Sequence, residues 1–189
     1  MKAGLILAAG EGARFGEQPK LLADIEGRSV LEHAINAQCA VPGLDRVVVV
    51  LGAHAAGVLA RVDFHCAEPV ICSEWREGIA ASLRRGVEEL DGAERVIVTL
   101  GDQPLVTPEV IGLFVDAEPG TRATYDGRPG HPVVMGPVQM RAVAKLRGDH
   151  GARDLLGDAP TIECGELCCG RDVDTVADLE AVREEAAAR

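Results

Sequence analysis

One stretch near the start of the chain joins an apolar run to a cluster of glycines and cations: AGLILAAGEGARFGEQPK, residues 3–20. The apolar part, residues 3–8, is continuous instead of alternating, which is typical of a strand covered on both faces of a parallel sheet. Glycines, an arginine and a lysine follow it directly. Ligands of open parallel sheets lie at the carboxyl ends of the strands, so this position predicts a binding loop.

Three more apolar runs extend the predicted sheet: RVVVVL (46–51), PVIC (69–72) and RVIVTL (95–100). We expect all of them to be buried strands. Segments with helical spacing lie between them, and helix starts are predicted at Ser29 with Glu32, Thr107 before Pro108, and Thr175 with Asp178. Strands that alternate with helices predict an α/β fold with three layers, in which a mostly parallel sheet carries helices on both faces in a Rossmann-like arrangement.

The length of 189 residues and a hydrophobic content of 47% suit a single domain over residues 1–189. The pattern becomes less regular after residue 120. GRPGHPVVMG (127–136) and GDHGARDLLGD (148–158) are rich in glycine, proline and charge. We expect residues 120–160 to form an insertion or lid, built on the sheet, that binds a second substrate.

Composition narrows the choice of partners and compartment. A net charge of −11 disfavours nucleic acid, and no apolar stretch approaches the roughly 20 residues that span a bilayer. We therefore expect no membrane partner and no secretory signal. The six cysteines are scattered, which favours reduced thiols in a cytoplasm and disfavours structural zinc: Cys39, Cys66, Cys72, Cys164, Cys168 and Cys169.

Two familiar phosphate loops do not fit the glycine stretch. Phe15 occupies the third glycine position of a dinucleotide fingerprint, and Gly16 comes one residue late. The second strand ends in residues 51–54, LGAH, without the acidic residue that would bind a ribose. A Walker loop needs Gly-Lys, but Gly16 is followed by Glu17. Neither motif is present.

The residues still favour anion binding. Gly10 and Gly12 permit positive φ and close backbone approach, so that their N–H groups can form an anion nest. Arg14 can bind terminal phosphates in a bidentate way, and Lys20, stiffened by Pro19, offers a compact charge for a transferring phosphoryl group. The alternative is an ordinary flexible loop with solvated cations.

The whole chain resembles the nucleotidyltransferases that activate molybdenum cofactor. LAAGEGARFGEQPKLL is similar to their signature LAAG-x-S-x-R-M-G followed by lysine, with Gly12 replacing serine and Phe15 replacing methionine. Further motifs follow in order: TLGDQP (99–104), GHPV (130–133), GDHGAR (148–153) and DVDT (172–175). Together they resemble the cytidylyltransferase branch, the MocA-like proteins within the MobA-like NTP transferase family, more than the guanylyltransferase branch. This resemblance implies a nucleotidyltransferase version of the Rossmann-like fold.

Asp102 directly follows the fourth apolar run, where a carboxylate suits Mg²⁺, although a plain strand-end turn is the alternative. Asp172 and Asp174 are two residues apart and share one face if that segment is extended. The resemblance favours Asp174 as the second metal ligand and leaves Asp172 to cap or stay solvated. With Arg14 and Lys20, these carboxylates indicate metal-assisted phosphoryl chemistry rather than acid–base hydrolysis.

The resemblance also implies where the substrates bind. The nucleotide is expected at Leu7, Ala8, Ala9, Gly10, Gly12, Arg14, Lys20, Gly78, Ser82 and Asp102. Gly78 would let a flat base approach and Ser82 would offer a hydroxyl, or the two residues merely begin a helix. Trp75 shields the site or covers the sheet edge. His131, Asp149 and Arg153 are expected to contact the acceptor. His131 is expected in an exposed turn and is not taken as a base, and Arg153 either meets a phosphate or pairs with a neighbouring acid.

The predicted reaction transfers CMP from CTP to the phosphate of molybdopterin or molybdenum cofactor, with Mg²⁺ as cofactor and pyrophosphate as product. Lys20, Arg14 and Asp102 are the expected catalytic residues. Molybdoenzyme maturation proteins are implied as partners. Alternatives that remain open are transfer of GMP, a sugar or polyol phosphate as acceptor, an NAD(P)H-dependent oxidoreductase and a catalytically silent binding protein on the same fold.

Overall fold

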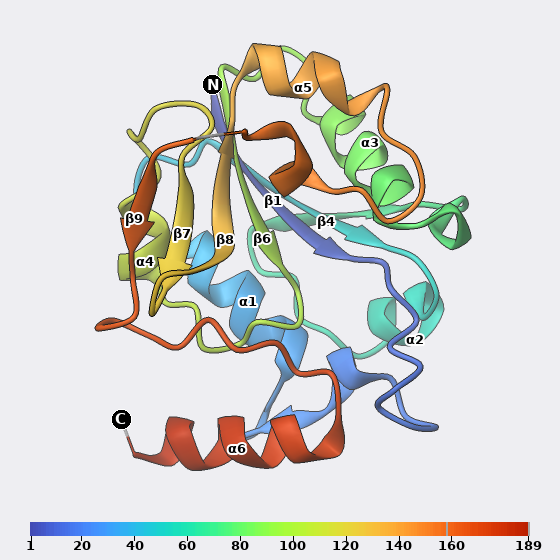
Figure 1. Ribbon diagram of the computed structural model, residues 1–189. Helices are drawn as coiled ribbons and strands as arrows, with labels where there is room; N and C mark the ends of the chain where they lie inside the picture. The colour runs from blue at the N-terminus through green and yellow to red at the C-terminus, as the bar shows by residue number, and fades with distance from the viewer. Residues whose placement is uncertain (158, 189) are drawn as a thin grey trace.

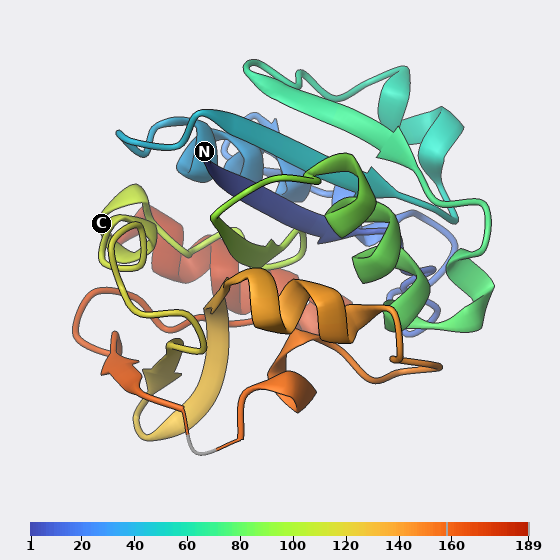
Figure 2. The ribbon, with the colours of Figure 1, turned by 90° about the horizontal axis from the view of Figure 1, so that it is seen from above.

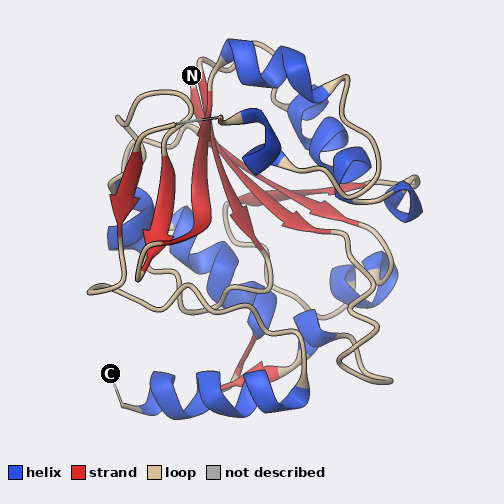
Figure 3. Ribbon diagram, in the orientation of Figure 1, coloured by secondary structure: helices blue, strands red, loops and turns tan. Residues whose placement is uncertain are grey.

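The computed structural model describes residues 1–157 and 159–188, and its centre is a seven-stranded sheet (Figures 1 and 3). The strands lie in the order β5-β4-β1-β6-β8-β7-β9. Neighbours are parallel except where β8 pairs with β6 and β7. The bounds are β1 Lys2–Ala8, β4 Arg46–Leu51, β5 Ala67–Ile71, β6 Arg95–Leu100, β7 Arg122–Tyr125, β8 Arg128–Met135 and β9 Thr161–Glu163. The predicted mostly parallel sheet is confirmed.

Alternate residues of the central strands bury their side chains on opposite faces of the sheet. Leu5 and Val48 face a core covered by α3 (Ile79–Glu89) and α5 (Pro137–Val143). Ile6 and Val49 face a second core covered by α1 (Val30–Cys39), and α4 (Pro108–Gly112) packs beside α1. Figure 2 shows these helices on the two sides of the sheet. Because helices cover both faces of the sheet, side chains on both faces of the central strands are buried, which explains the continuous apolar runs. Each fully buried Leu, Ile or Val side chain contributes about 1.5–3 kcal/mol to folding stability.

The predicted helix starts are confirmed. Ser29 accepts the N–H of Glu32 and closes a capping box at α1, and Thr107 caps α4 before Pro108. Thr175 caps α6 (Val176–Ala187), which lies at the far end of the molecule with the small hairpin β2 (Asp24–Ile25) and β3 (Arg28–Ser29) (Figure 1). Within the described residues, none of the helices is long and apolar enough to cross a bilayer.

The run 69–72 does not form a buried strand. It overlaps β5, which pairs only with β4 and is therefore an edge strand. Glu68, Pro69 and Ile71 are exposed, and 54% of Ile71 is accessible to solvent. An apolar run of this length does not show whether a strand has one neighbour or two, so the expectation of burial was wrong here. Proline suits such an edge because it lacks the N–H that a further strand would need.

The region after residue 120 is part of the sheet itself. It supplies β7, β8 and β9 together with α5 and the short 3₁₀ helix η3 (Ala152–Leu155). The stretch GHPV lies inside β8, so His131 is half-buried in a strand and not in an exposed turn. Antiparallel pairing of β8 with both neighbours explains how a Gly- and Pro-containing segment can be a strand. Asp158, the last residue of the stretch 148–158, lies outside the described residues.

Two cysteines are bonded to each other. Cys39 ends α1 and forms a disulfide with Cys66, just before β5, with 6.0 Å between their Cα atoms. The expectation of reduced thiols throughout is therefore wrong for this pair, whereas the other four cysteines are free. Their sequence separation of 27 residues concealed the pairing, which depends on how the β4-to-β5 connection folds back. The argument from reduced thiols for a cytoplasmic location loses its force.

Candidate functional site

Three charged side chains from distant segments meet at the carboxyl ends of β1 and β6. The Nζ of Lys20 lies 2.5 Å from Oδ2 of Asp102 and 2.9 Å from Oδ1 of Asp174. Lys20 begins the 3₁₀ helix η1 (Lys20–Leu22), Asp102 follows β6, and Asp174 precedes α6. Parallel pairing brings the ends of β1 and β6 together, and this places the glycine loop beside the strand-end carboxylate.

Lys20 is buried although it carries a charge, with 10% of its side chain exposed. Burial alone would lower the pKa of Lys20, but the charges of Asp102 and Asp174 and their hydrogen bonds outweigh that effect and raise it. The ammonium group is therefore a fixed positive charge at neutral pH. Such a charge costs no rearrangement when negative charge develops beside it.

Gly12 makes room for the Lys20 side chain. Its φ is +66°, a backbone conformation that favours glycine. A Cβ at this position would lie 3.1 Å from Cγ of Lys20, which is closer than ordinary packing allows. A serine in the same backbone would therefore be strained and would push against the lysine. Glycine, where the signature that this loop resembles has serine, therefore fits the local geometry.

Arg14 reaches the same cluster from the exposed side of the loop. Its Nη2 lies 2.8 Å from Oδ2 of Asp174, and 74% of its side chain is exposed. Asp174 thus accepts from Lys20 with one oxygen and from Arg14 with the other. An exposed guanidinium held by one ion pair is weakly fixed, so Arg14 can exchange this partner for a phosphate.

The carboxylates suit a hard divalent cation. Oδ1 of Asp102 is buried and has no hydrogen-bond partner, so one acceptor oxygen remains for a ligand. Asp174 faces the same ammonium group as Asp102 and brings a second set of oxygens. In the described part of the chain, His, Cys, Asp and Glu form no cluster of three that could hold a metal ion. Mg²⁺ usually keeps one or two carboxylates and takes its other ligands from phosphates and water.

Asp172 has a different environment from Asp174. Its Oδ1 accepts a 2.7 Å hydrogen bond from Nε2 of Gln103, which also donates to the carbonyl of Gly170. Loss of hydration and the negative charge of Asp102 raise the pKa of Asp172. The backbone N–H of Val173, between the two aspartates, donates to the carbonyl of Asp102. Gln103 and Asp172 thereby tie the segment that carries Asp174 to the end of β6.

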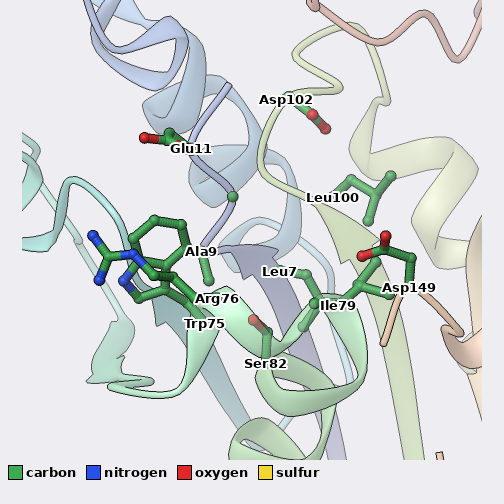
Figure 4. A pocket seen from close by; sticks show the side chains of 12 residues that line it. Leu7, Ala9, Glu11, Trp75, Arg76, Ile79, Ser82, Leu100, Asp102 and Asp149 are labelled. Carbon is green, nitrogen blue, oxygen red and sulfur yellow. The ribbon is translucent and has the colours of Figure 1, made fainter. Parts of the chain in front are cut away.

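A cavity of about 570 Å³ opens beside this cluster (Figure 4). Trp75 and Arg76 lie together on one side of it, and Asp149 lies on the opposite side. Ser82 and Ile79 line it from α3. The full lining is Leu7, Ala9, Gly10, Glu11, Trp75, Arg76, Gly78, Ile79, Ser82, Leu100, Asp102 and Asp149. Six of the ten expected nucleotide residues therefore line one hollow. Ala8, Gly12 and Lys20 line a smaller hollow next to it, and Arg14 lines neither.

The three expected acceptor residues share another hollow. His131, Asp149 and Arg153 line a space of about 150 Å³ that shares Leu7, Ile79, Leu100 and Asp149 with the larger cavity. Burial, assisted by the positive charge of Arg153, lowers the pKa of His131 to about 4. His131 is therefore neutral at pH 7 and can donate or accept a hydrogen bond. Arg153 supplies the positive charge of this hollow.

Comparison with known protein families shows the family to which the chain belongs. The model of the MobA-like NTP transferase domain matches residues 4–163. The chain belongs to the MobA-like NTP transferase family. The match includes the glycine loop, Lys20 and Asp102, whereas Asp174 lies beyond its end. The family is described as a nucleoside triphosphate transferase domain, so transferase activity is supported.

Individual relatives of this family member carry several names. Nicotine blue oxidoreductase of Paenarthrobacter nicotinovorans is 36% identical over 188 residues, which cover 92% of each protein. Purine catabolism protein PucB of Bacillus subtilis is 28% identical and 95% of each is covered. A crystal structure of Rv0371c from Mycobacterium tuberculosis superimposes with a TM-score of 0.82 at 28% identity, and 97% of each chain is covered. Its complex with manganese superimposes with a TM-score of 0.78 at 28% identity, covering 97% of this chain and 98% of the other. The Rossmann-like nucleotidyltransferase fold is thereby confirmed.

Two glycines of this MobA-like protein have backbone features that the sequence did not specify. Gly12 adopts positive φ, but Gly10 does not, so the left-handed conformation belongs to Gly12 and Gly16 in this loop. Gly78 has φ +99°, and a Cβ there would lie 2.4 Å from the backbone of Gly148. Gly78 therefore lets the loop that contains Gly148 approach closely. It also lines the main cavity, so its expected role of admitting a flat base stays a prediction.

Sequence reasoning missed several residues that line the main cavity. Glu11, Arg76, Ile79 and Leu100 were not singled out. The guanidinium carbon of Arg76 lies 4.4 Å from the centroid of the Trp75 ring, so the two form a stacked pair at the cavity wall. The sequence did hold a signal for this pair, because a tryptophan is followed directly by an arginine after the end of a strand. Of the two uses considered for Trp75, its place in the lining favours shielding of the site.

Proposed function

We propose that this MobA-like protein transfers CMP from CTP to the phosphate of molybdopterin or molybdenum cofactor and releases pyrophosphate. The observation that supports the proposal most strongly is the cluster of Lys20, Asp102 and Asp174 beside the glycine loop. A buried ammonium group, a carboxylate oxygen without a partner and an adjoining cavity of about 570 Å³ suit a nucleoside triphosphate. The resemblance of GDQP, GHPV and GDHGAR to the cytidylyltransferase branch favours CTP.

In the proposed reaction, an oxygen of the acceptor phosphate attacks the α-phosphorus of the triphosphate. A new P–O bond forms, the bond to the β-phosphate oxygen breaks, and the electron pair leaves with pyrophosphate. A phosphate monoester is already an anion at neutral pH, so no general base is needed. Catalysis then consists of positioning and charge neutralisation. Lys20, fixed between two carboxylates, stabilises the charge that develops on the α-phosphoryl group.

The other cationic and acidic groups divide the remaining tasks. Arg14 releases Asp174 and binds the departing pyrophosphate. Asp102, through Oδ1, and Asp174 would hold Mg²⁺, which when bound screens the negative charges of the phosphates. The cations Lys20 and Arg14 are both paired with carboxylates, so the site alone offers little net positive charge to a triphosphate. Nucleotide binding is therefore expected to depend on the divalent ion.

The hollow beside β8 is the proposed acceptor site. Arg153 would bind the acceptor's phosphate, and neutral His131 would donate or accept a hydrogen bond without adding charge. Because this hollow shares Leu7, Ile79 and Leu100 with the main cavity, an acceptor there lies next to the nucleotide. Transfer of GMP, or a sugar or polyol phosphate as acceptor, uses the same machinery and remains the nearest alternative.

A second candidate function is an NAD(P)H-dependent oxidoreductase. The relative named nicotine blue oxidoreductase, at 36% identity over 92% of each protein, favours it. Two observations on this chain oppose it. The end of β4, Leu51 followed by Gly52, brings no acidic residue for the ribose of a dinucleotide, and Phe15 occupies the third glycine position of the dinucleotide fingerprint.

The test is to incubate the purified protein with Mg²⁺, molybdopterin and each nucleoside triphosphate, and to measure pyrophosphate and the nucleotide-linked product by mass spectrometry. At a Mg²⁺ concentration that just saturates the wild type, Asp102→Asn is expected to lose most of its activity. Asp91→Asn, an exposed carboxylate outside the lining of the main cavity, is its matched control. CMP transfer lost in Asp102→Asn alone supports the proposal. GMP transfer would change the base assignment. Oxidation of NADPH with nicotine blue, without pyrophosphate release, would contradict nucleotidyl transfer.

A further inference from the structure

The turn after β4, residues 52–54, makes two hydrogen bonds with the backbone of the glycine loop. The N–H of Ala53 donates to the carbonyl of Ala9 at 3.1 Å. Nε2 of His54 lies 2.9 Å from the carbonyl oxygen of Glu11. A carbonyl only accepts, so Nε2 of His54 is the donor. His54 precedes α2 (Ala55–Leu59), but its side chain does not cap that helix, so this hydrogen bond accounts for its orientation.

Close packing keeps this turn in contact with the loop. A Cβ on Gly52 would lie 2.4 Å from the carbonyl oxygen of Ala9 and 2.7 Å from Cβ of Trp75. Only a glycine permits that approach. Residues 52–54 therefore form one surface against which the backbone of residues 9–11 rests. The Trp75 side chain packs against the same surface and lines the main cavity.

The direction of the loop's N–H groups follows from these contacts. A trans peptide unit points its C=O and its N–H in opposite directions. The peptides after Ala9 and Glu11 are trans, because the cis peptide of the described chain lies in β8. The carbonyls of Ala9 and Glu11 point toward the turn, where they accept hydrogen bonds from residues 53 and 54. The N–H groups of Gly10 and Gly12, on the opposite side of the same peptides, therefore point away from the turn. Both glycines line the small hollow that also contains Lys20 and Asp102.

We propose that His54 is a positioning residue for polyphosphate binding. By holding the carbonyl of Glu11, it keeps the N–H of Gly12 directed at the phosphates, while touching no phosphate itself. Gly12 has no side chain to restrict rotation of this peptide, and the hydrogen bond from His54 fixes its orientation. The inference rests on the proposed function in one respect, that the glycine loop binds a polyphosphate.

The test uses inorganic tripolyphosphate with Mg²⁺ as the probe, so that neither a base nor an acceptor is needed. Its dissociation constant is measured by calorimetry for the wild type, His54→Ala and His54→Gln. Loss of one oriented donor should weaken binding about tenfold in His54→Ala. His54→Gln keeps an N–H donor and should recover most of the affinity. His33→Ala is the matched control, because Nε2 of His33 lies 3.0 Å from the carbonyl of Ile25, outside the phosphate loop.

Circular dichroism and thermal unfolding establish that each variant is folded. His54→Leu, which keeps apolar volume, replaces His54→Ala if the latter does not fold. Weak binding in His54→Ala or His54→Leu, with recovery in His54→Gln and no change in His33→Ala, supports the inference. Wild-type affinity in the folded alanine or leucine variant would overturn it. Tripolyphosphate binding that depends on His54 in a protein that transfers no nucleotide would refute the proposed function and leave this inference standing.

Discussion

The two halves of the site are held in different ways. Lys20 is buried between two carboxylates at the ends of parallel strands, and its pKa is raised by them. Asp149 and Arg153 lie exposed on the segments that follow α5, next to the antiparallel strand β8. Buried ion pairs give one half a fixed geometry, whereas the exposed groups of the other half can adapt. This contrast agrees with the proposed function, which assigns nucleotidyl transfer to the first half and acceptor binding to the second.

Removing Lys20 should have the largest effect. Lys20→Ala takes away the buried charge beside the α-phosphoryl group, and kcat should fall about 10²–10³-fold. Lys20→Arg should recover little, because a planar guanidinium group cannot take the place of the compact ammonium group between Asp102 and Asp174. Pyrophosphate release measures the effect, with the exposed Lys145→Ala as control. Full activity in folded Lys20→Ala would place the chemistry elsewhere.

Removing the carboxylate of Asp174 should affect the Mg²⁺ dependence of activity more than removing that of Asp172. Asp102→Asn and Asp174→Asn should each raise the Mg²⁺ concentration for half-maximal activity about 10–100-fold, since a metal oxygen ligand is lost. Asp172→Asn should change it far less, because Gln103 already holds that carboxylate. Titration of activity with Mg²⁺ tests the ranking. A larger effect at Asp172 than at Asp174 would reverse the assignment.

Arg153→Ala should separate the two halves most clearly. Loss of a phosphate-binding guanidinium should raise KM for the acceptor about tenfold and leave KM for the nucleotide unchanged. Steady-state kinetics with each substrate varied in turn supplies both values. Arg147→Ala is a suitable control, because this exposed arginine donates to the carbonyls of Ala144 and Leu146. Equal effects on both substrates would remove the distinction.

The smallest effect concerns stability at acidic pH. The pKa of His131 falls from 6.5 to about 4 on folding, so between these values the unfolded chain binds the proton more strongly than the folded chain. Stability from this group is therefore complete above pH 6.5 and is lost as the pH falls toward 4. Urea unfolding should show a loss of about 1–2 kcal/mol between pH 7 and pH 5. His131→Gln should remove that part of the pH dependence; an unchanged dependence would show that His131 does not cause it.

The sequence predicted features that are set locally and failed for features that depend on which distant segments become neighbours. Continuous apolar runs and capping pairs such as Ser29 with Glu32 specify parallel strands and helix starts locally, and these predictions were confirmed. The burial of β5, the position of His131 in β8 and the bond between Cys39 and Cys66 depend on which segments become neighbours. No local pattern encodes that choice, so these features were mispredicted.

The same distinction applies within the site. Lys20 and Asp102 could be grouped from sequence, because the glycine loop follows β1 and Asp102 follows β6. Asp174 was added to them by the family resemblance. The tasks of Gly12 and Gly78 could not be predicted, since they depend on the Lys20 side chain and on the backbone of Gly148. Glycine in a sequence marks conformational freedom, but only the packed structure shows which group approaches it.

A crystal structure with CTP and Mn²⁺ tests the central claim most directly, with the anomalous signal of manganese locating the metal. The account predicts manganese bound to Oδ1 of Asp102 and to Asp174, with the triphosphate against the backbone of Gly10 and Gly12 and beside Lys20. A triphosphate bound elsewhere, or manganese away from both carboxylates, would contradict it.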